Sequence, residues 1–246
     1  MLFENLLLAA QTHAQQGGIG IGYWVIIIGT TLVSMLISST LKSRFNEYSR
    51  IPIRMTGAEV AEAMLRQNGI NDVRVISVPG LLTDHYDPIK KTVNLSEMVY
   101  GMNSVAAAAV AAHECGHAVQ HQQAYAWLNF RSKMVPAVQF ASSLQQYLMM
   151  AAMFGLFLFH SPFMLWLLVA VFAVTALFAV VTLPVEFDAS KRAMVWLERS
   201  GVANQMEHEK AQNALFWAAM TYVAGAVGAV AQLLYWLSLA MGRRND

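Results

Sequence analysis

Two histidines stand four positions apart in the run His113-Glu114-Cys115-Gly116-His117. On a helix such residues share one face and lie about 6 Å apart along the axis, so both imidazoles can bind one metal ion. Zinc held by two neutral imidazoles lowers the pKa of a bound water toward about 7. Glu114 lies beside the open coordination position, where it can accept the proton of that water. The run therefore predicts a zinc-dependent hydrolytic centre.

A catalytic zinc needs a third protein ligand. His121 continues the spacing, but an unbroken helix places it about 12 Å along the axis from His113, which is too far for one ion. It is better explained as a surface or substrate-side residue. We expect the third ligand to be Glu186, because two histidines and a glutamate form a known catalytic zinc set. The alternative for Glu186 is a solvated carboxylate at the start of a helix.

The histidine run also has structural interpretations. Histidine pairs at this spacing occur by chance in structural helices. Cys115 could ligate zinc or react, but on an ideal helix it points away from the histidine face, which favours a packing role. It is the only cysteine of the chain, so an intramolecular disulfide is excluded.

The composition indicates a membrane protein. Of the 246 residues, 57% are hydrophobic and 13% are charged, against roughly 25% charged in soluble proteins. A lipid bilayer is therefore the expected surrounding. The formal net charge is +1 and no lysine- or arginine-rich run is present, so nucleic acid is set aside as a partner.

Four segments are long and apolar enough to cross a bilayer, which takes about 20 residues of helix. They are 19–39, 137–159, 163–183 and 214–241. Gln139, Gln145 and Gln146 in the second must face protein or a watery cavity, and a re-entrant or tilted helix is the alternative there. Gly225 and Gly228 permit close helix contact, which would suit a homo-oligomer or a membrane-protein partner.

The basic residues suggest an orientation in the membrane. Lysines and arginines concentrate in three stretches, which are 42–74, 131–133 and 191–199. By the positive-inside rule the two polar blocks between spans should be cytoplasmic, although Arg243 and Arg244 favour the opposite weakly. Segment 1–16 has neither the basic start nor the cleavage site of a secretory signal, so we expect it to be retained.

The first polar block predicts a small α+β domain. Thr56 and Glu59 form a capping box, so a short helix should follow and end near Gly69. Segments 73–78 and 92–95 have the pattern of strands, and we expect them to pair as a β-hairpin.

The histidine run should lie on a helix. Ser96 and Ser104 are suitable N-caps, and the alanine-rich stretch 105–112 has high helix propensity and leads directly into the run.

Together these features predict a mainly α, integral membrane fold with about four transmembrane helices and a small α+β zinc-metallopeptidase domain. The expected divisions are an N-terminal segment with the first transmembrane helix, the metallopeptidase domain, a transmembrane hairpin, the region of the third ligand, and the fourth transmembrane helix with the tail. In that order they cover 1–40, 41–135, 136–184, 185–213 and 214–246.

Two segments carry a resemblance to a known family. His-Glu-Cys-Gly-His-Ala-Val-Gln at 113–120 and Leu-Pro-Val-Glu-Phe-Asp-Ala-Ser at 183–190 resemble the YugP-type neutral zinc metallopeptidases of bacterial membranes. Further similar segments lie at 84–88, 93–96 and 219–224. The resemblance implies a Zn²⁺ cofactor and a polypeptide substrate. It also implies the site residues, with Glu114 as the catalytic residue and with the zinc ligands His113, His117 and Glu186.

The family is similar in layout to the HtpX and CAAX-protease group, in which an aspartate four residues after the ligand glutamate orients a ligand histidine. Ser190 stands at that position here, and Asp188 lies two residues off the expected face. A ligand histidine usually donates its other N–H to a carboxylate, carbonyl or water, so its partner is left open. A scaffold protein that keeps zinc for structural purposes is the alternative function, and the intact Glu114 argues against it.

Three further residues are candidates for contact with substrate or with the zinc ligands, namely Asp188, Tyr222 and His85. His85 belongs to a polar cluster with Asp84 and Asp87 that a solvated turn explains equally well. Tyr222 could donate a hydrogen bond to a developing oxyanion, but an interfacial or packing tyrosine is the more common case.

The predicted activity is that of a membrane-embedded zinc endopeptidase acting on membrane-associated or misfolded polypeptides at the cytoplasmic membrane surface. Its expected location is the bacterial plasma (inner) membrane, as a multi-pass protein. An intramembrane protease of the site-2 type is the alternative, but its motif helix would need a full apolar span. Polar residues at 120–123 and Arg131 end the apolar run too early for that.

Overall fold

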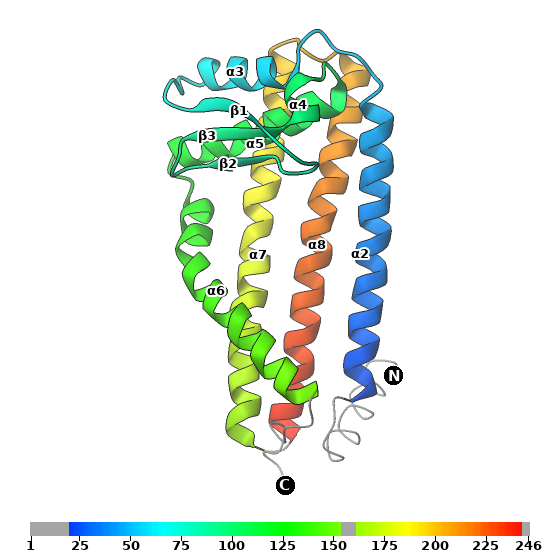
Figure 1. Ribbon diagram of the computed structural model, residues 1–246, viewed down its shortest axis with the longest axis vertical. Coiled ribbons are helices and arrows are strands. Elements are labelled where there is room, and N and C mark those ends of the chain that lie inside the picture. The colour runs from blue at the N-terminus through cyan, green and yellow to red at the C-terminus, as the bar shows by residue number, and fades with distance from the viewer. Residues whose placement is uncertain (1–19, 154–160, 243–246) are drawn as a thin grey trace. The chain divides into compact units, whose positions relative to one another are not determined.

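The computed structural model describes residues 20–153 and 161–242 (Figure 1). It is mainly helical and holds a small sheet, as the sequence predicts. In chain order the elements are α2 (Ile21–Tyr48), α3 (Gly57–Gln67), β1 (Arg74–Val78), β2 (His85–Asp87), β3 (Thr92–Ser96), α4 (Glu97–Gly101), α5 (Val105–Gln122), α6 (Ala126–Met153), α7 (Pro162–Arg199) and α8 (Gln205–Gly242).

The chain forms two compact units. The sheet unit comprises residues 36–130 and 182–221, and it contains the three strands and helices α3 to α5. Of the described residues, the helical unit comprises 20–35, 131–153, 161–181 and 222–242. Helices α2, α6, α7 and α8 contribute residues to both units.

The strands of the sheet lie in the order β1-β3-β2, so β3 is central. All five residues of β3 are buried. β1 pairs with β3 in parallel, with Arg74 opposite Thr92, and β2 pairs with β3 antiparallel. The predicted hairpin between 73–78 and 92–95 is therefore wrong, because these two strands run in the same direction.

The hairpin of this sheet instead joins β2 to β3. The carboxylate of Asp87 accepts hydrogen bonds from the backbone amides of Ile89 and Lys90, each at 2.9 Å. An aspartate that binds the backbone two residues on favours a reversal of the chain. The segment 84–88 gave no strand signal in the sequence, because it is short and polar and ends in Pro88.

Helix α3 begins at the predicted capping box. The Thr56 side chain accepts a hydrogen bond from the Glu59 amide at 3.3 Å, and the Glu59 carboxylate accepts one from the Thr56 amide at 2.7 Å. Two of the otherwise free amides at the helix start are thereby satisfied. The helix ends at Gln67, and Gly69 beyond it has a φ of 73°, which glycine adopts without strain. The predicted limits of this helix are confirmed.

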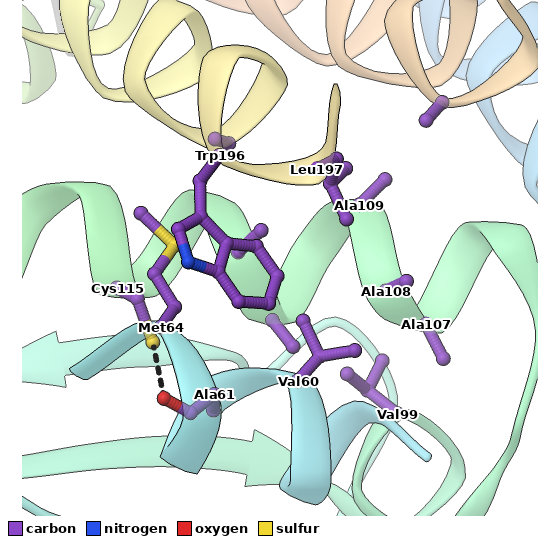
Figure 2. Close-up of a cluster of buried hydrophobic side chains, with 14 of the residues drawn as sticks. Val60, Ala61, Met64, Val99, Ala107, Ala108, Ala109, Cys115, Trp196 and Leu197 are labelled. Atoms are coloured by element: carbon purple, nitrogen blue, oxygen red, sulfur yellow. Dashed lines mark hydrogen bonds between the residues drawn. The ribbon is translucent and has the colours of Figure 1, made fainter. Parts of the chain in front are cut away.

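The core of the sheet unit lies where α3 packs against α5. Figure 2 shows Val60 and Met64 of α3 in one buried cluster with Trp196 and Leu197 of α7 and with alanines of α5. The indole Nε1–H of Trp196 donates to the side-chain oxygen of Gln67 at 2.9 Å, which links α7 to α3. Because the side chains of α5 are small at this place, α3 and α7 pack closely against it.

Three described helices, α2, α7 and α8, are long and apolar enough to cross a membrane. The spans predicted at 19–39, 163–183 and 214–241 fall largely on them. The span predicted at 137–159 falls on α6 as far as Met153, and residues 154–160 lie outside the described part of the chain. The fourth span therefore stays a prediction.

Polar residues of α6 line a cavity in the helical unit. Its volume is about 590 Å³, and Gln145 and Gln146 share it with Thr175 of α7 and Gln232 of α8. This is the setting that the sequence required for two of the three glutamines in this segment, whereas Gln139 is exposed.

A side chain at Gly228 would contact Thr30 of α2 at 3.5 Å, so α8 and α2 approach closely there.

The capping box provides a first test of the sheet unit. Thr56→Ala should lower the free energy of unfolding by about 1 kcal/mol, because it leaves the amide of Glu59 without its side-chain acceptor. Denaturant unfolding of the protein in detergent, followed by the helical circular dichroism signal, measures the change. Thr56→Ser is the control, since it keeps the hydroxyl; equal losses in both variants would contradict the capping role.

Candidate metal centre

The two histidines lie one helical turn apart on α5. This helix begins at Ser104, whose side chain accepts a hydrogen bond from the amide of Ala107 at 3.3 Å, as expected of an N-cap. The ring centroids of His113 and His117 are 4.8 Å apart and the rings are nearly perpendicular, at 86°. The helix therefore presents both imidazoles on the same face.

Glu186 of α7 faces both imidazoles. One carboxylate oxygen, Oε2, lies 3.3 Å from Nε2 of His113 and 3.6 Å from Nε2 of His117. The side chain of Glu186 is only 3% exposed. It belongs to the interior of a helix that continues through Pro184 to Arg199, so the alternative of a solvated carboxylate at a helix start is wrong.

The donor atoms of these three residues fit a zinc ion. A tetrahedral zinc bound at about 2.0 to 2.1 Å has ligand atoms about 3.3 Å apart. The spacings from the Glu186 oxygen to the two Nε2 atoms, 3.3 and 3.6 Å, are close to this value. One ligand atom from each residue lies within 4.8 Å of the others. His113, His117 and Glu186 could therefore hold a metal together.

The other nitrogen of each ring has a protein partner. Ser190 Oγ lies 3.1 Å from Nδ1 of His113, and Gln120 Oε1 lies 3.0 Å from Nδ1 of His117. Ser190, four residues after Glu186, thus contacts one of the two histidines. Asp188 reaches neither ring and instead accepts a hydrogen bond from Gln120 at 2.8 Å. Sequence reasoning assigned no role to Gln120, although it lies three residues after His117 and ends the segment 113–120.

Burial and charge act on His117 in opposite directions. Burial alone would lower the pKa of its imidazole, but the nearby carboxylates of Glu186 and Glu114 outweigh it and raise the pKa above the ordinary value. An anionic environment of this kind also favours a bound cation. The site is therefore electrostatically suited to a metal ion.

Glu114 lies next to the cluster in sequence and is anchored by the sheet. Its Oε2 accepts a hydrogen bond from the backbone amide of Tyr86 in β2 at 3.1 Å. This contact joins α5 to an outer strand of the sheet. Glu114 is thus held by a backbone donor outside its own helix, which limits the directions in which its carboxylate can point.

Cys115 packs on the opposite side of α5, as the helical spacing predicts. It is fully buried, and its Sγ lies 3.5 Å from the carbonyl oxygen of Ala61 in α3 (Figure 2). Burial raises the pKa of the thiol well above its ordinary value, and the nearby charge of Glu114 adds to this. A thiol in this state is a poor nucleophile and a poor metal ligand.

The remaining polar candidates lie outside the three-residue cluster. His121 is exposed and its Nδ1 is 3.0 Å from the hydroxyl of Tyr86. His85 is also exposed, with Nδ1 2.7 Å from the carbonyl oxygen of Thr83. Asp84 accepts hydrogen bonds from the amide and hydroxyl of Ser96.

Two of the candidates have other settings. Asp87 forms the turn between β2 and β3. Tyr222 belongs to the helical unit, and its part in the chemistry stays a prediction.

Comparison with known proteins adds independent information. The model of a family described as "Putative neutral zinc metallopeptidase" matches residues 23–241. The chain belongs to this neutral zinc metallopeptidase family. It is also 36% identical, over the full length of both chains, to the "Putative membrane protease YugP" of Bacillus subtilis (strain 168). No solved structure matches the chain.

In this member of the neutral zinc metallopeptidase family, α5 and α7 touch through their backbones beside the cluster. A Cβ atom at Gly116 would lie 2.6 Å from the carbonyl oxygen of Ala189, closer than real contacts of this kind. Glycine at this position therefore lets the helix of the two histidines approach the helix of Glu186.

Gly116→Ala should separate the two helices. We expect the free energy of unfolding to fall by about 1 to 3 kcal/mol, as for other overpacked sites, and zinc binding to weaken with it. Denaturant unfolding and zinc titration of the purified protein measure both effects. The control is Gly101→Ala, where a Cβ atom meets nothing within 4 Å. A Gly116→Ala protein as stable as this control would contradict the close-contact role.

The ligand set can be tested by metal content. Glu186→Ala should remove the only carboxylate of the cluster, and the purified variant should lose its zinc during dialysis against a weak chelator. His121→Ala should keep it, because His121 lies outside the cluster. Elemental analysis of both proteins gives the zinc per chain. Full zinc occupancy in the Glu186→Ala protein would exclude Glu186 as the third ligand.

Proposed function

We propose that the protein is a membrane-embedded zinc endopeptidase that cleaves membrane-associated or misfolded polypeptides at the cytoplasmic membrane surface. The observation that carries the proposal is the convergence of His113, His117 and Glu186, with Glu114 anchored next to them. Membership in the neutral zinc metallopeptidase family and similarity to a protein named as a membrane protease support the same chemistry.

The residues divide the reaction between them. Zinc, when bound, supplies the Lewis acidity that activates water and polarises the carbonyl of a peptide bond. His113, His117 and Glu186 would hold it. Glu114 would take a proton from the attacking water as the new C–O bond forms at the carbonyl carbon. It would then give that proton to the amide nitrogen as the C–N bond breaks.

The hydrogen bond from Tyr86 supports this role of Glu114. It engages one carboxylate oxygen, Oε2, at 3.1 Å. The other oxygen remains for a water molecule, since a carboxylate can accept several hydrogen bonds. A general base must lie within hydrogen-bonding reach of the proton that it removes, and a fixed carboxylate favours this.

A catalytic role for the metal fits the number of ligands. Structural zinc sites are almost always closed by four protein ligands, whereas catalytic sites have three and leave one position open. Among the described residues the cluster offers three, from His113, His117 and Glu186. This favours an enzyme over a scaffold that keeps zinc for structural purposes.

Two observations support the proposed location of the metal centre at the cytoplasmic membrane surface: which helices are apolar enough to span a membrane, and where the basic residues lie. α5 is not one of the three described helices that qualify as spans, which argues against an intramembrane protease of the site-2 type. Two of the three basic stretches, 42–74 and 191–199, lie within the sheet unit, and the third, 131–133, lies in the helical unit. By the positive-inside rule these segments would be cytoplasmic.

The decisive experiment separates zinc binding from cleavage. Glu114→Gln should retain zinc, because Glu114 is not a member of the cluster, and should lose nearly all peptidase activity because the amide cannot accept the proton. Wild type and variant are purified in detergent, their zinc is measured, and both are incubated with casein and with candidate membrane proteins.

Cleavage by the wild type alone, at equal zinc content, supports the endopeptidase. Zinc in both proteins without cleavage by either would contradict it and favour a structural role for the metal. Cleavage by both would remove Glu114 from the mechanism.

A further inference from the structure

Gln120 is a buried amide that joins the two helices of the metal centre. Its side chain has no exposed surface. Its nitrogen Nε2 donates to the carbonyl oxygen of Val185 and to a carboxylate oxygen of Asp188, both at 2.8 Å. Its oxygen Oε1 lies 3.0 Å from Nδ1 of His117. Every polar atom of the Gln120 side chain therefore has a partner in the protein.

These partners allow only one orientation of the amide. A carbonyl oxygen and an ionised carboxylate can accept hydrogen bonds but cannot donate them. The NH₂ group of Gln120 must therefore face Val185 and Asp188. In the reverse orientation the amide oxygen of Gln120 would lie against the oxygens of Val185 and Asp188, with no hydrogen between them. Its oxygen must then face His117.

The fixed amide determines which nitrogen of His117 carries the proton. An amide oxygen only accepts, so Nδ1 of His117 must be the donor in this hydrogen bond. In the neutral ring the lone pair then lies on Nε2. This is the atom that lies 3.6 Å from the Glu186 oxygen. The ring is thus prepared to bind a metal through Nε2.

We propose that Gln120 is the positioning residue of His117, holding it as the Nδ1–H tautomer, and that Asp188 acts on the metal centre through Gln120. The proposal rests on the proposed role of His117 as a zinc ligand. A carboxylate is one common direct partner of a ligand histidine; in this chain an amide stands between the carboxylate and the ring.

Asp188 is itself held in place. Nε of Arg192, one turn further along α7, donates to the same carboxylate oxygen at 2.5 Å. The Arg192 guanidinium also donates to the side-chain oxygen of Gln123 at 2.6 Å. The series from Arg192 through Asp188 to Gln120 therefore ends at the imidazole.

The partner of His113 leaves the protonation of its ring nitrogens open. Its Nδ1 lies 3.1 Å from the hydroxyl of Ser190, and a hydroxyl can rotate to donate or to accept. Ser190 therefore does not determine the tautomer of His113. The two ligand histidines differ in this respect, and Gln120 accounts for the difference.

The zinc affinity of the purified full-length protein tests the role of Gln120. Gln120→Met keeps the length of the side chain and removes its hydrogen bonds. It should weaken zinc binding by about 10- to 100-fold, as is usual when the partner of a ligand histidine is lost. Competition with a chromogenic chelator gives the affinity, and the visible absorption of the Co²⁺-loaded protein should change with the geometry at His117.

Gln122→Met is the matched control. It removes the same side chain from the last residue of the same helix, where Gln122 is exposed. Its zinc affinity and Co²⁺ spectrum should equal those of the wild type. The proposal is overturned if Gln120→Met binds zinc as tightly as this control, or if both variants weaken binding equally.

A second test, for the case that Gln120→Met does not fold, exchanges the amide of Gln120 with the carboxylate of Asp188. Gln120→Glu places a carboxylate against Asp188 and Val185, so it should weaken zinc binding. Adding Asp188→Asn restores a donor opposite the new carboxylate, which can still accept from Nδ1 of His117. Zinc affinity should recover in part in the double variant, because the carbonyl oxygen of Val185 still lacks its donor. Equal affinities in the single and double variants would contradict the proposed series.

These results are separable from the endopeptidase. If the wild type binds zinc and cleaves nothing, while Gln120→Met loses zinc affinity, the proposed endopeptidase function is wrong and the positioning role of Gln120 is supported. If the wild type cleaves and Gln120→Met keeps full zinc affinity, the positioning role is wrong and the endopeptidase function is supported.

Discussion

A buried carboxylate shared by two imidazoles is the interaction on which the sheet unit depends. An ionised group out of water costs several kcal/mol unless opposite charge or hydrogen bonds offset that cost. The side chain of Glu186 is 3% exposed, and the nitrogens of His113 and His117 lie within 3.6 Å of it. The fold must therefore hold α5 and α7 in a fixed relation, since a shift between them would leave the buried carboxylate without the imidazoles that face it.

The surface between α5 and α7 serves packing and chemistry at once. The absence of a side chain at Gly116 lets the backbones meet at Ala189. The same surface brings Ser190 to one ring and places Gln120 against the carbonyl oxygen of Val185. The orientation of the ligands is thus a property of the helix contact, because the partners of the rings lie on both helices.

Local signals in the sequence predicted local features well. The capping box at Thr56, the N-cap at Ser104 and the shared face of His113 and His117 all depend on residues within one or two helical turns. The parallel pairing of β1 with β3 and the role of Gln120 were not predictable in this way. Each depends on contacts between distant parts of the chain, and a glutamine next to a histidine run gives no sign of what lies opposite it. Glu186 was predicted because a catalytic zinc requires a third ligand and because segment 183–190 resembles the family.

The continuity of α7 has a mechanical consequence. Glu186 stands inside a single helix that runs from Pro162 to Arg199, without a loop that could absorb movement. A slip of this helix by one residue would advance it by about 1.5 Å and turn it by about 100°, which would carry the carboxylate away from both imidazoles. In the proposed metal centre, an axial rotation of α7 at Glu186 would therefore weaken metal binding.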